Sequence, residues 1–369
     1  MLEKIRAMKR FFILLFLFPF VHSAQSKKET NAVDVNIFRG NVMLHTDDLG
    51  ALQGHAQAVM INFSRQTHGE LEWQKAYNYP DYGAFLLYQN YNNDILGKIY
   101  SAGMNYNFYF LNRNLMFKIG QGLAYATSPY NKENNSKNKS FGSEILANTN
   151  MALFYKRENI IDNFGIQAGF LFTHFSNGRI KSPNSGINTY GFDLGINYNF
   201  EKKQPKVADT VKFSNKMYEP IKYNFVFRSG VNESTIIGSG RHPFYHLSAY
   251  ADKRLNRKSA LQLGTDVFLT TSFIDYIKYI SVAYPDKNLN PNTDYKRVGI
   301  FAGHELFINK FSVEFQIGYY VYQPFKNDLA IYDRLGAKYY FNKNIFTSFH
   351  IKTHLFLAEA LEFGVGYRL

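Results

Sequence analysis

Two residues, His174 and Ser176, have the side-chain types and the spacing best suited to chemistry in this sequence. A serine hydroxyl becomes a strong nucleophile when a neighbouring base removes its proton, and a third group that orients the base assists it. Residues i and i+2 of a β-strand point to the same face, about 6.5–7 Å apart, so direct contact requires a bend or bulge at the strand end. The pair predicts either a hydrolase of the serine type or, alternatively, a polar strand end without catalytic function.

The segment that must position this pair is the alternating run FGIQAGFLFTHFSNG, residues 164–178. His174 shares its parity with five apolar residues: Phe164, Ile166, Ala168, Phe170 and Phe172. The opposite parity begins with small or polar residues: Gly165, Gln167 and Gly169. If the apolar parity faces lipid, the pair lies at the edge of a membrane, where a lipid ester could meet it.

The composition indicates an outer-membrane β-barrel. The chain holds 35 Phe, 28 Tyr and one Trp, and its mean hydropathy is slightly polar at −0.30. A sequence rich in aromatic residues that alternates apolar and polar positions is typical of barrels that cross the outer membrane. The net charge of +13 favours contact with anionic lipid head groups. No nucleic-acid motif accompanies the charge, so no nucleic-acid partner is expected.

The first 24 residues predict a cleaved signal peptide. Four basic residues precede the apolar stretch 11–21, and small residues follow near Ser23 and Ala24. The apolar stretch is too short for a membrane-spanning helix. The chain has no cysteine, which excludes disulfides and a lipoprotein anchor. These features together predict export to the envelope, and localisation in the outer membrane, of a Gram-negative bacterium.

Sixteen alternating segments predict an all-β, antiparallel transmembrane fold. Eight precede residue 200: roughly 35–46, 55–65, 82–93, 97–111, 115–127, 143–157, 163–176 and 189–200. Eight follow a linker at 201–220: roughly 222–233, 245–255, 259–271, 296–309, 311–323, 330–341, 345–355 and 358–369. Eight strands enclose an interior filled by side chains, whereas about sixteen leave an aqueous channel. Two barrels and one larger barrel both remain possible.

Loop lengths predict the orientation of these strands. Connections after even-numbered strands are short, and several after odd-numbered strands are long, at about 128–142, 177–188, 234–244 and 272–295. Barrels of the outer membrane have short periplasmic turns and longer outer loops. Both ends of the chain are therefore expected in the periplasm and His174 at the outer side. The stretch 66–81, which contains Trp73, is too long for an ordinary turn and is interpreted as a plug or an interfacial segment.

The segment HFSNGRIKSPNSGINTYGFDLGINYNF resembles the signature of the lipid A 3-O-deacylase family, outer-membrane esterases built on an eight-stranded barrel. The matched pattern is His174-x-Ser176-Asn177, then Pro183-Asn184-x-Gly186, then an alternating strand. A weaker similarity in strand number and spacing extends over residues 35–200. The resemblance leaves the second half of the chain, 221–369, without an expected role.

The resemblance implies a role for each matched residue. Ser176 would attack the acyl carbonyl, and His174 would act as general base and then as general acid. The Asn177 side chain would help to stabilise the oxyanion. The family has a glutamate two residues after the glycine of its second motif, and this chain has Asn188 there. An asparagine can orient a histidine by hydrogen bonding, but it brings no full charge to the imidazolium.

Further candidates concern the substrate and metals. Arg179 and Lys181 are predicted to bind lipid A phosphates, although such loop charges can equally be solvated. His304-Glu305 begins like a zinc-protease motif, but no second histidine follows at the required spacing. No metal site and no organic cofactor are predicted.

The sequence thus predicts a membrane-embedded serine esterase that removes an ester-linked acyl chain from lipid A, in lipopolysaccharide, or from a related acylated glycolipid. The expected organisation is a signal peptide at 1–24, a deacylase-like barrel unit at 25–200, a linker at 201–220 and a second barrel-like unit at 221–369. The alternative function is that of a non-catalytic barrel, either a channel or a structural protein on a deacylase-like scaffold.

Overall fold

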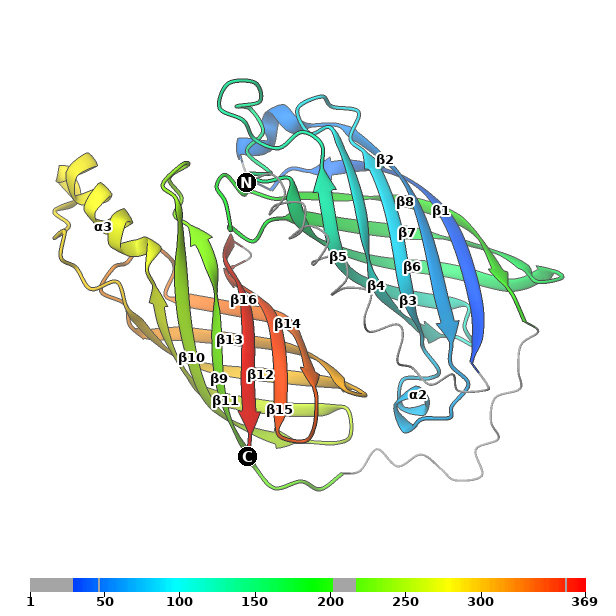
Figure 1. Ribbon diagram of the computed structural model, residues 1–369. Helices are drawn as coiled ribbons and strands as arrows, with labels where there is room; N and C mark the ends of the chain where they lie inside the picture. Colours follow the sequence, from blue (N-terminus) through cyan, green and yellow to red (C-terminus); the bar gives the residue numbers. More distant parts are fainter. Residues whose placement is uncertain (1–28, 46, 202–216, 356) are drawn as a thin grey trace, which may run out of the picture.

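The computed structural model describes residues 29–45, 47–201, 217–355 and 357–369, and these residues form two closed antiparallel barrels of eight strands each (Figure 1). Of the two arrangements that the sequence left open, two barrels is therefore the observed one. The predicted signal peptide and most of the predicted linker lie outside the described residues.

The first barrel contains strands β1 to β8 in sequential order, and it closes where β1 pairs with β8. Its strands are β1 (Thr30–Met43), β2 (His55–Gln66), β3 (Asp81–Asn90), β4 (Lys98–Phe110), β5 (Leu115–Ala126), β6 (Ile145–Ile161), β7 (Phe164–Ser176) and β8 (Ile187–Asn199). Each corresponds to a predicted segment, and β1 begins about five residues earlier than expected.

The second barrel contains strands β9 to β16 and closes where β16 pairs with β9. Its strands are β9 (Lys222–Glu233), β10 (Arg241–Arg254), β11 (Ser259–Thr270), β12 (Arg297–Ile308), β13 (Phe311–Tyr322), β14 (Ile331–Tyr340), β15 (Ile345–His354) and β16 (Leu357–Arg368). The eight predicted segments of this half are also confirmed.

The alternation of side chains determines which face of each strand points outward. Along β7, Phe164, Ile166 and Phe170 are each more than half exposed, whereas Leu171 is 1% exposed. Phe170 packs against Phe192 of the neighbouring strand on the same outer face, with ring centroids 4.5 Å apart. The prediction that the parity of His174 faces outward is thus confirmed.

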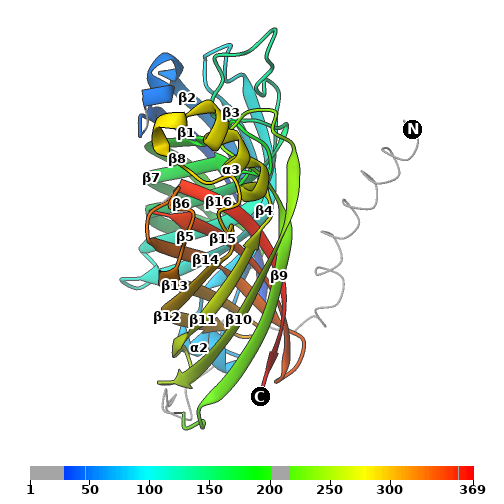
Figure 2. The same cartoon turned by 90° about the vertical axis from the view of Figure 1, so that its left-hand side faces the viewer.

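The helices are short and lie at the ends of the barrels. Helix α3 (Ser272–Ala283) and the 3-10 helices η2 (Asp47–Leu52) and η3 (Pro285–Lys287) belong to connections at the end with long loops, opposite the C-terminus (Figure 2). Helix α2 (Glu72–Ala76) lies at the other end. Within the described residues, no helix has the length and apolar character needed to cross a bilayer.

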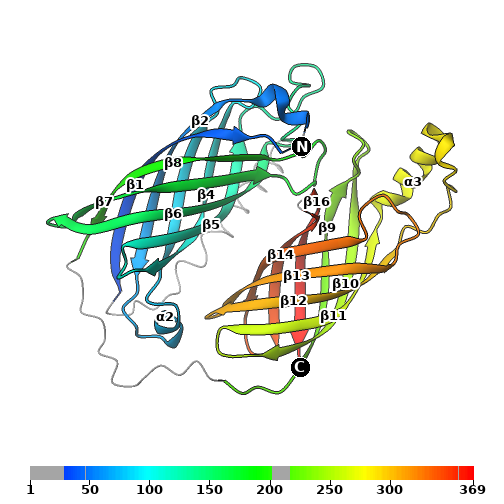
Figure 3. The same ribbon diagram turned by 180° about the vertical axis from the view of Figure 1, so that it is seen from behind.

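Helix α2 gives the long stretch 66–81 a place in the fold, because it contacts the turns of the second barrel (Figure 3). Glu72 forms an ion pair with Arg257, and the Lys258 ammonium donates to the carbonyl of Ala76 at 3.2 Å. The Tyr77 hydroxyl donates to the Phe307 carbonyl at 2.7 Å, and burial raises the pKa of Tyr77, which keeps this donor protonated. The segment joins the two barrels rather than plugging one.

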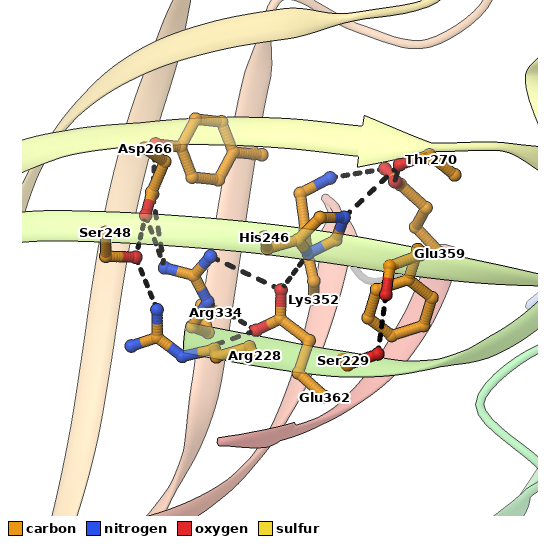
Figure 4. Close-up of polar contacts among 12 residues, drawn as sticks. Arg228, Ser229, His246, Ser248, Asp266, Thr270, Arg334, Lys352, Glu359 and Glu362 are labelled. Carbon is orange, nitrogen blue, oxygen red and sulfur yellow. Dashed lines mark hydrogen bonds and ion pairs between the residues drawn. The ribbon is translucent and has the colours of Figure 1, made fainter. Parts of the chain in front are cut away.

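The interior of the second barrel is filled by charged side chains that neutralise one another (Figure 4). The Arg334 guanidinium lies between Glu362, at 2.6 Å, and Asp266, at 3.2 Å. The imidazole of His246 contacts Glu362 at 2.6 Å, and Glu359 pairs with Lys352. All these side chains are at most 1% exposed. Eight strands leave room for side chains but not for an aqueous channel, and these ion pairs occupy that room.

Candidate functional site

The structure brings together the three residues that the sequence predicted to act as a catalytic group. The Nε2 atom of His174 lies 3.0 Å from the Ser176 hydroxyl oxygen. Its Nδ1 atom lies 2.6 Å from Oδ1 of Asn188. Because an amide oxygen can only accept, Nδ1 carries the proton of a neutral imidazole and the lone pair of Nε2 faces the hydroxyl. This is the arrangement that a histidine needs to act as a base towards a serine.

The barrel itself sets this geometry. His174 on β7 and Asn188 on β8 are direct cross-strand partners, so their side chains leave the sheet side by side on the outer face. Ser176 is the last residue of β7, where the chain turns into the loop 177–186. Residues i and i+2 of an ideal strand lie about 6.5–7 Å apart. Because β7 ends at Ser176, its hydroxyl comes within hydrogen-bonding distance of His174.

A fourth residue, His45, extends the group, and sequence reasoning did not find it. Its Nε2 atom lies 3.0 Å from the Ser185 carbonyl, which can only accept, so Nε2 carries the proton of the neutral ring. Its Nδ1 atom then accepts a hydrogen bond from Nδ2 of Asn188 at 3.3 Å; the Met43 carbonyl lies at the same distance but offers this nitrogen no proton. His45 therefore turns the oxygen of the Asn188 amide towards His174.

The loop after Ser176 is held by Asn177, which is 2% exposed. Its Nδ2 atom donates to the Ser143 hydroxyl at 3.0 Å and to the Lys181 carbonyl at 2.7 Å. Its backbone N–H donates to the side chain of Asn184 at 2.8 Å. Both side-chain hydrogens are thus in use, and the oxyanion role predicted for Asn177 requires one of these bonds to break.

Gly186, the glycine of the second predicted motif, packs closely against the His174 ring. Gly186 has φ +68°, and a methyl group on it would lie 3.0 Å from Cε1 of His174 and 3.3 Å from Cβ of Ser176. Backbone with φ in this range is costly for residues with a Cβ. Glycine at this position lets the loop pass under the imidazole without displacing it.

We expect the Gly186→Ala variant to lower kcat about 10- to 100-fold, because the added methyl pushes against the His174 ring and strains the loop. The measurement is ester hydrolysis by the folded, purified protein. Gly238→Ala provides the matched control, since that glycine also has positive φ but has no atom within 4 Å of an added Cβ. Equal rates for the two variants would contradict the close packing under His174.

Arg179 and Lys181, predicted to bind phosphate, have different surroundings in the structure. The Arg179 guanidinium donates to two main-chain carbonyls of the second barrel, those of Glu233 at 3.2 Å and Ala358 at 3.4 Å. The remaining nitrogen, Nη2, has no hydrogen-bond partner among the described residues but is buried, so a phosphate contact by Arg179 would require this part of the loop to open. Lys181 lines an open cavity of about 920 Å³, to which Arg241 of the second barrel also contributes. The cavity is therefore bounded by both barrels.

One group of described residues offers metal-ligating atoms close together, namely Asp328, His354 and Glu359. Glu359 already pairs with Arg297 and Lys352. These two cations neutralise the carboxylates and oppose the entry of a third positive charge. The arrangement fits an ion-pair network better than a metal centre.

Comparison with known proteins gives two matches to protein families. Residues 57–197 match the family model described as lipid A 3-O-deacylase (PagL). Residues 221–369 match the model described as the C-terminal domain of acyloxyacyl hydrolase. The two matched ranges do not overlap. Together they include strands β2 to β16, except for the first two residues of β2 and the last two of β8. No curated protein matches the chain.

Solved structures of other barrels also match parts of the chain. The outer membrane enzyme PagL is 18% identical, and the alignment covers 44% of this chain and 97% of that one with a TM-score of 0.33. Neisserial surface protein A is 12% identical, with 47% and 100% covered and a TM-score of 0.31. A mutant porin of Rh. blastica is 9% identical, with 92% and 100% covered and a TM-score of 0.20. Because all three TM-scores are below 0.5, the assignment to a family depends on the two family models alone.

Proposed function

Because residues 57–197 match the lipid A 3-O-deacylase model and residues 221–369 match the acyloxyacyl hydrolase C-terminal domain, we propose that the first barrel is an outer-membrane serine esterase that removes an ester-linked acyl chain from lipid A or a related acylated glycolipid. The observation that carries the proposal is the continuous hydrogen-bonded series Ser176 Oγ, His174 Nε2, His174 Nδ1 and Asn188 Oδ1. A merely polar strand end would not need this order of donors and acceptors.

The reaction proceeds through an acyl-enzyme. Oγ of Ser176 attacks the carbonyl carbon of the ester while Nε2 of His174 takes the hydroxyl proton, and the carbonyl electron pair moves to the oxygen. When the tetrahedral intermediate collapses, the bond between the carbonyl carbon and the sugar oxygen breaks. His174 returns its proton to that leaving oxygen. Water then attacks the acyl-serine by the same steps and releases the fatty acid.

Asn188 fixes the orientation and the tautomer of His174 but carries no charge. During attack the imidazole becomes positively charged, and a carboxylate at this position would stabilise it more strongly than an amide. We therefore assign this protein a slower esterase reaction than that of a relative with glutamate there. His45 supports the amide by accepting a hydrogen bond from its Nδ2 atom.

The position of the group suits a substrate in the outer leaflet. His174 and Ser176 lie at the barrel end that carries the long loops, on the face where apolar side chains point outward. An acyl chain would lie along that apolar face, while the sugar and phosphate groups would lie among the loops. Lys181, which lines the cavity beside the loop, is the residue we assign to a phosphate.

The direct test is a hydrolysis assay with the purified full chain in detergent micelles and purified hexa-acylated lipid A. We expect one fatty acid to be released per lipid A, with a matching loss of mass from the glycolipid, and no release without protein. Protein that is folded, as shown by heat-dependent mobility in gel electrophoresis, and yet releases no fatty acid would refute the proposal.

The rival function of a channel has a separate expected result. In planar bilayers we expect no stepwise ion conductance from the full chain, because buried side chains fill the interior of each barrel. In the second barrel Arg228, Arg334 and Glu362 are fully buried within that interior. Regular conductance steps would favour the channel. A porin reconstituted in the same way serves as the positive control.

A further inference from the structure

We propose that the second barrel is a positioning element for the esterase site, and that it acts by holding the loop 177–186 through Arg179 and Glu233. The inference depends on the proposed function, since the loop begins at the residue after the nucleophile Ser176. It gives the second half of the chain a role that neither the sequence motifs nor the family description supplies.

Glu233, at the end of β9, anchors the distal part of the loop. Its carboxylate accepts a hydrogen bond from the backbone N–H of Ser182 at 2.8 Å and another from Gly240 at 3.2 Å. Glu233 is 3% exposed, so these two donors partner a carboxylate that has little contact with water. The Ser182 hydroxyl adds a third bond, to the Ser234 carbonyl at 2.6 Å. A buried carboxylate that lost these donors would raise the free energy of the folded protein. This cost favours the conformation in which the loop is bonded to Glu233.

Arg179 anchors the part of the loop nearest to the nucleophile. Its carbonyl accepts a hydrogen bond from the backbone N–H of Glu233 at 3.0 Å, and its Nε atom donates to the Glu233 carbonyl at 3.2 Å. Its Nη1 atom reaches the carbonyl of Ala358 on β16 at 3.4 Å. The residue thus bridges the ends of two adjacent strands of the second barrel.

Close packing accompanies these polar contacts. Gly178, with φ +59°, lies against Leu361 of β16, and a methyl group on Gly178 would be 2.1 Å from Cγ of that leucine. Leu361 is 8% exposed. The contact is two residues from Ser176, so the second barrel touches the chain next to the nucleophile.

The anchored residues connect directly to the catalytic group. Asn177 donates to the Lys181 carbonyl, which lies between the anchors Arg179 and Ser182. Gly186 and Ser185, farther along the same loop, contact His174 and His45. Displacing a reacting group by about 1 Å can lower a rate about 100-fold, so restraint of this loop acts on catalysis. At the opposite end, the hydrogen bond from the Tyr77 hydroxyl to the Phe307 carbonyl holds the second barrel beside the first.

The test compares Glu233→Gln and Arg179→Ala with the control Arg257→Ala in the full-length protein. The glutamine keeps one acceptor oxygen but places its NH₂ donor against the N–H group of either Ser182 or Gly240, so one of the two hydrogen bonds is lost. We expect each of the two loop variants to lower kcat about 10- to 100-fold while KM changes less than about threefold. Arg257→Ala removes an exposed ion pair between the barrels far from the site, and it should leave both values unchanged. Heat-dependent gel mobility checks that all variants are folded.

A second measurement does not depend on activity. Trypsin can cut the loop after Lys181, and we expect resistance in the wild type and in Arg257→Ala but cleavage in Glu233→Gln. If Glu233→Gln and Arg179→Ala keep the wild-type kcat, or if trypsin fails to distinguish Glu233→Gln from the wild type, the positioning role is wrong. An inactive wild type would refute the proposed esterase, whereas the trypsin result would still decide whether the second barrel holds the loop.

Discussion

The Ser176→Ala variant is expected to lose at least about 1000-fold in kcat for ester hydrolysis, and His174→Ala is expected to lose a similar factor. The first removes the atom that attacks the carbonyl, and the second removes the base that accepts its proton. When two residues act in the same step, removing either one abolishes most of their joint contribution to kcat. The double variant should therefore be little slower than either single variant. Both substitutions leave a methyl group in place of the side chain, and neither interrupts the backbone pairing of β7 with β6 and β8.

The measurement is release of fatty acid from lipid A by purified protein, with the folded fraction determined for each sample. Ser281→Ala is a suitable control, because that hydroxyl is bonded within α3 and lies outside the site. Wild-type rates from folded Ser176→Ala would show that another residue is the nucleophile. A double variant far slower than both single variants would argue that the two side chains act independently.

The Asn188→Glu variant is expected to increase kcat about tenfold. Asn188 lies directly opposite His174 in the strand register, and its Oδ1 atom already accepts the Nδ1–H bond. A glutamate reaching the same atom would keep the tautomer and add a negative charge beside the imidazolium that forms during attack. A hydrogen bond to a charged partner contributes about 1.5–3 kcal/mol, compared with about 1 kcal/mol for a neutral one. The difference corresponds to roughly a tenfold rate increase.

The matched comparison is Asn188→Ala, which removes the orienting acceptor and is expected to lower kcat about 100-fold. The two substitutions should therefore move the rate in opposite directions at the same position. If Asn188→Glu loses all activity while the barrel remains folded, Asn188 does not occupy the place of the third catalytic residue. If Asn188→Ala matches the wild type, the amide has no orienting role.

The sequence predicted the strands well because outward and inward residues alternate along each one. Phe170 and Leu171 illustrate the rule, with exposures of 58% and 1%. Closure could not be predicted in the same way. A strand such as β8 shows the same alternation whether it pairs with β1 or continues into a larger sheet, so only the structure separates two barrels from one.

The sequence predicted only part of the site, because only some of its residues are close to one another in the sequence. His174 and Ser176 are near one another in the sequence, and Asn188 lies in the next strand, so a local motif can reveal them. His45 follows a strand that is distant in the sequence but adjacent once the barrel closes, where Met43 pairs with Asn188. No pattern around residue 45 signals that role.

Contacts between the barrels could not be predicted from the sequence either, because they join residues that are far apart along the chain. Ser182 and Glu233 are 51 residues apart and belong to different barrels, and no periodicity connects them. The sequence predicted that Arg179 either binds phosphate or is a solvated loop charge, because it lies in a polar loop. The second barrel, whose position could not be deduced, supplies the carbonyls that its guanidinium contacts.

The measurement that tests the esterase most directly is mass spectrometry of lipid A from bacterial cells that express the wild-type chain, the Ser176→Ala variant or neither. We predict that lipid A from wild-type cells has lost one acyl chain, while lipid A from the other two strains remains intact. The variant must reach the outer membrane at wild-type abundance for the comparison to count. Identical lipid A in all three strains, or deacylation that persists in Ser176→Ala, would contradict a serine esterase at this site.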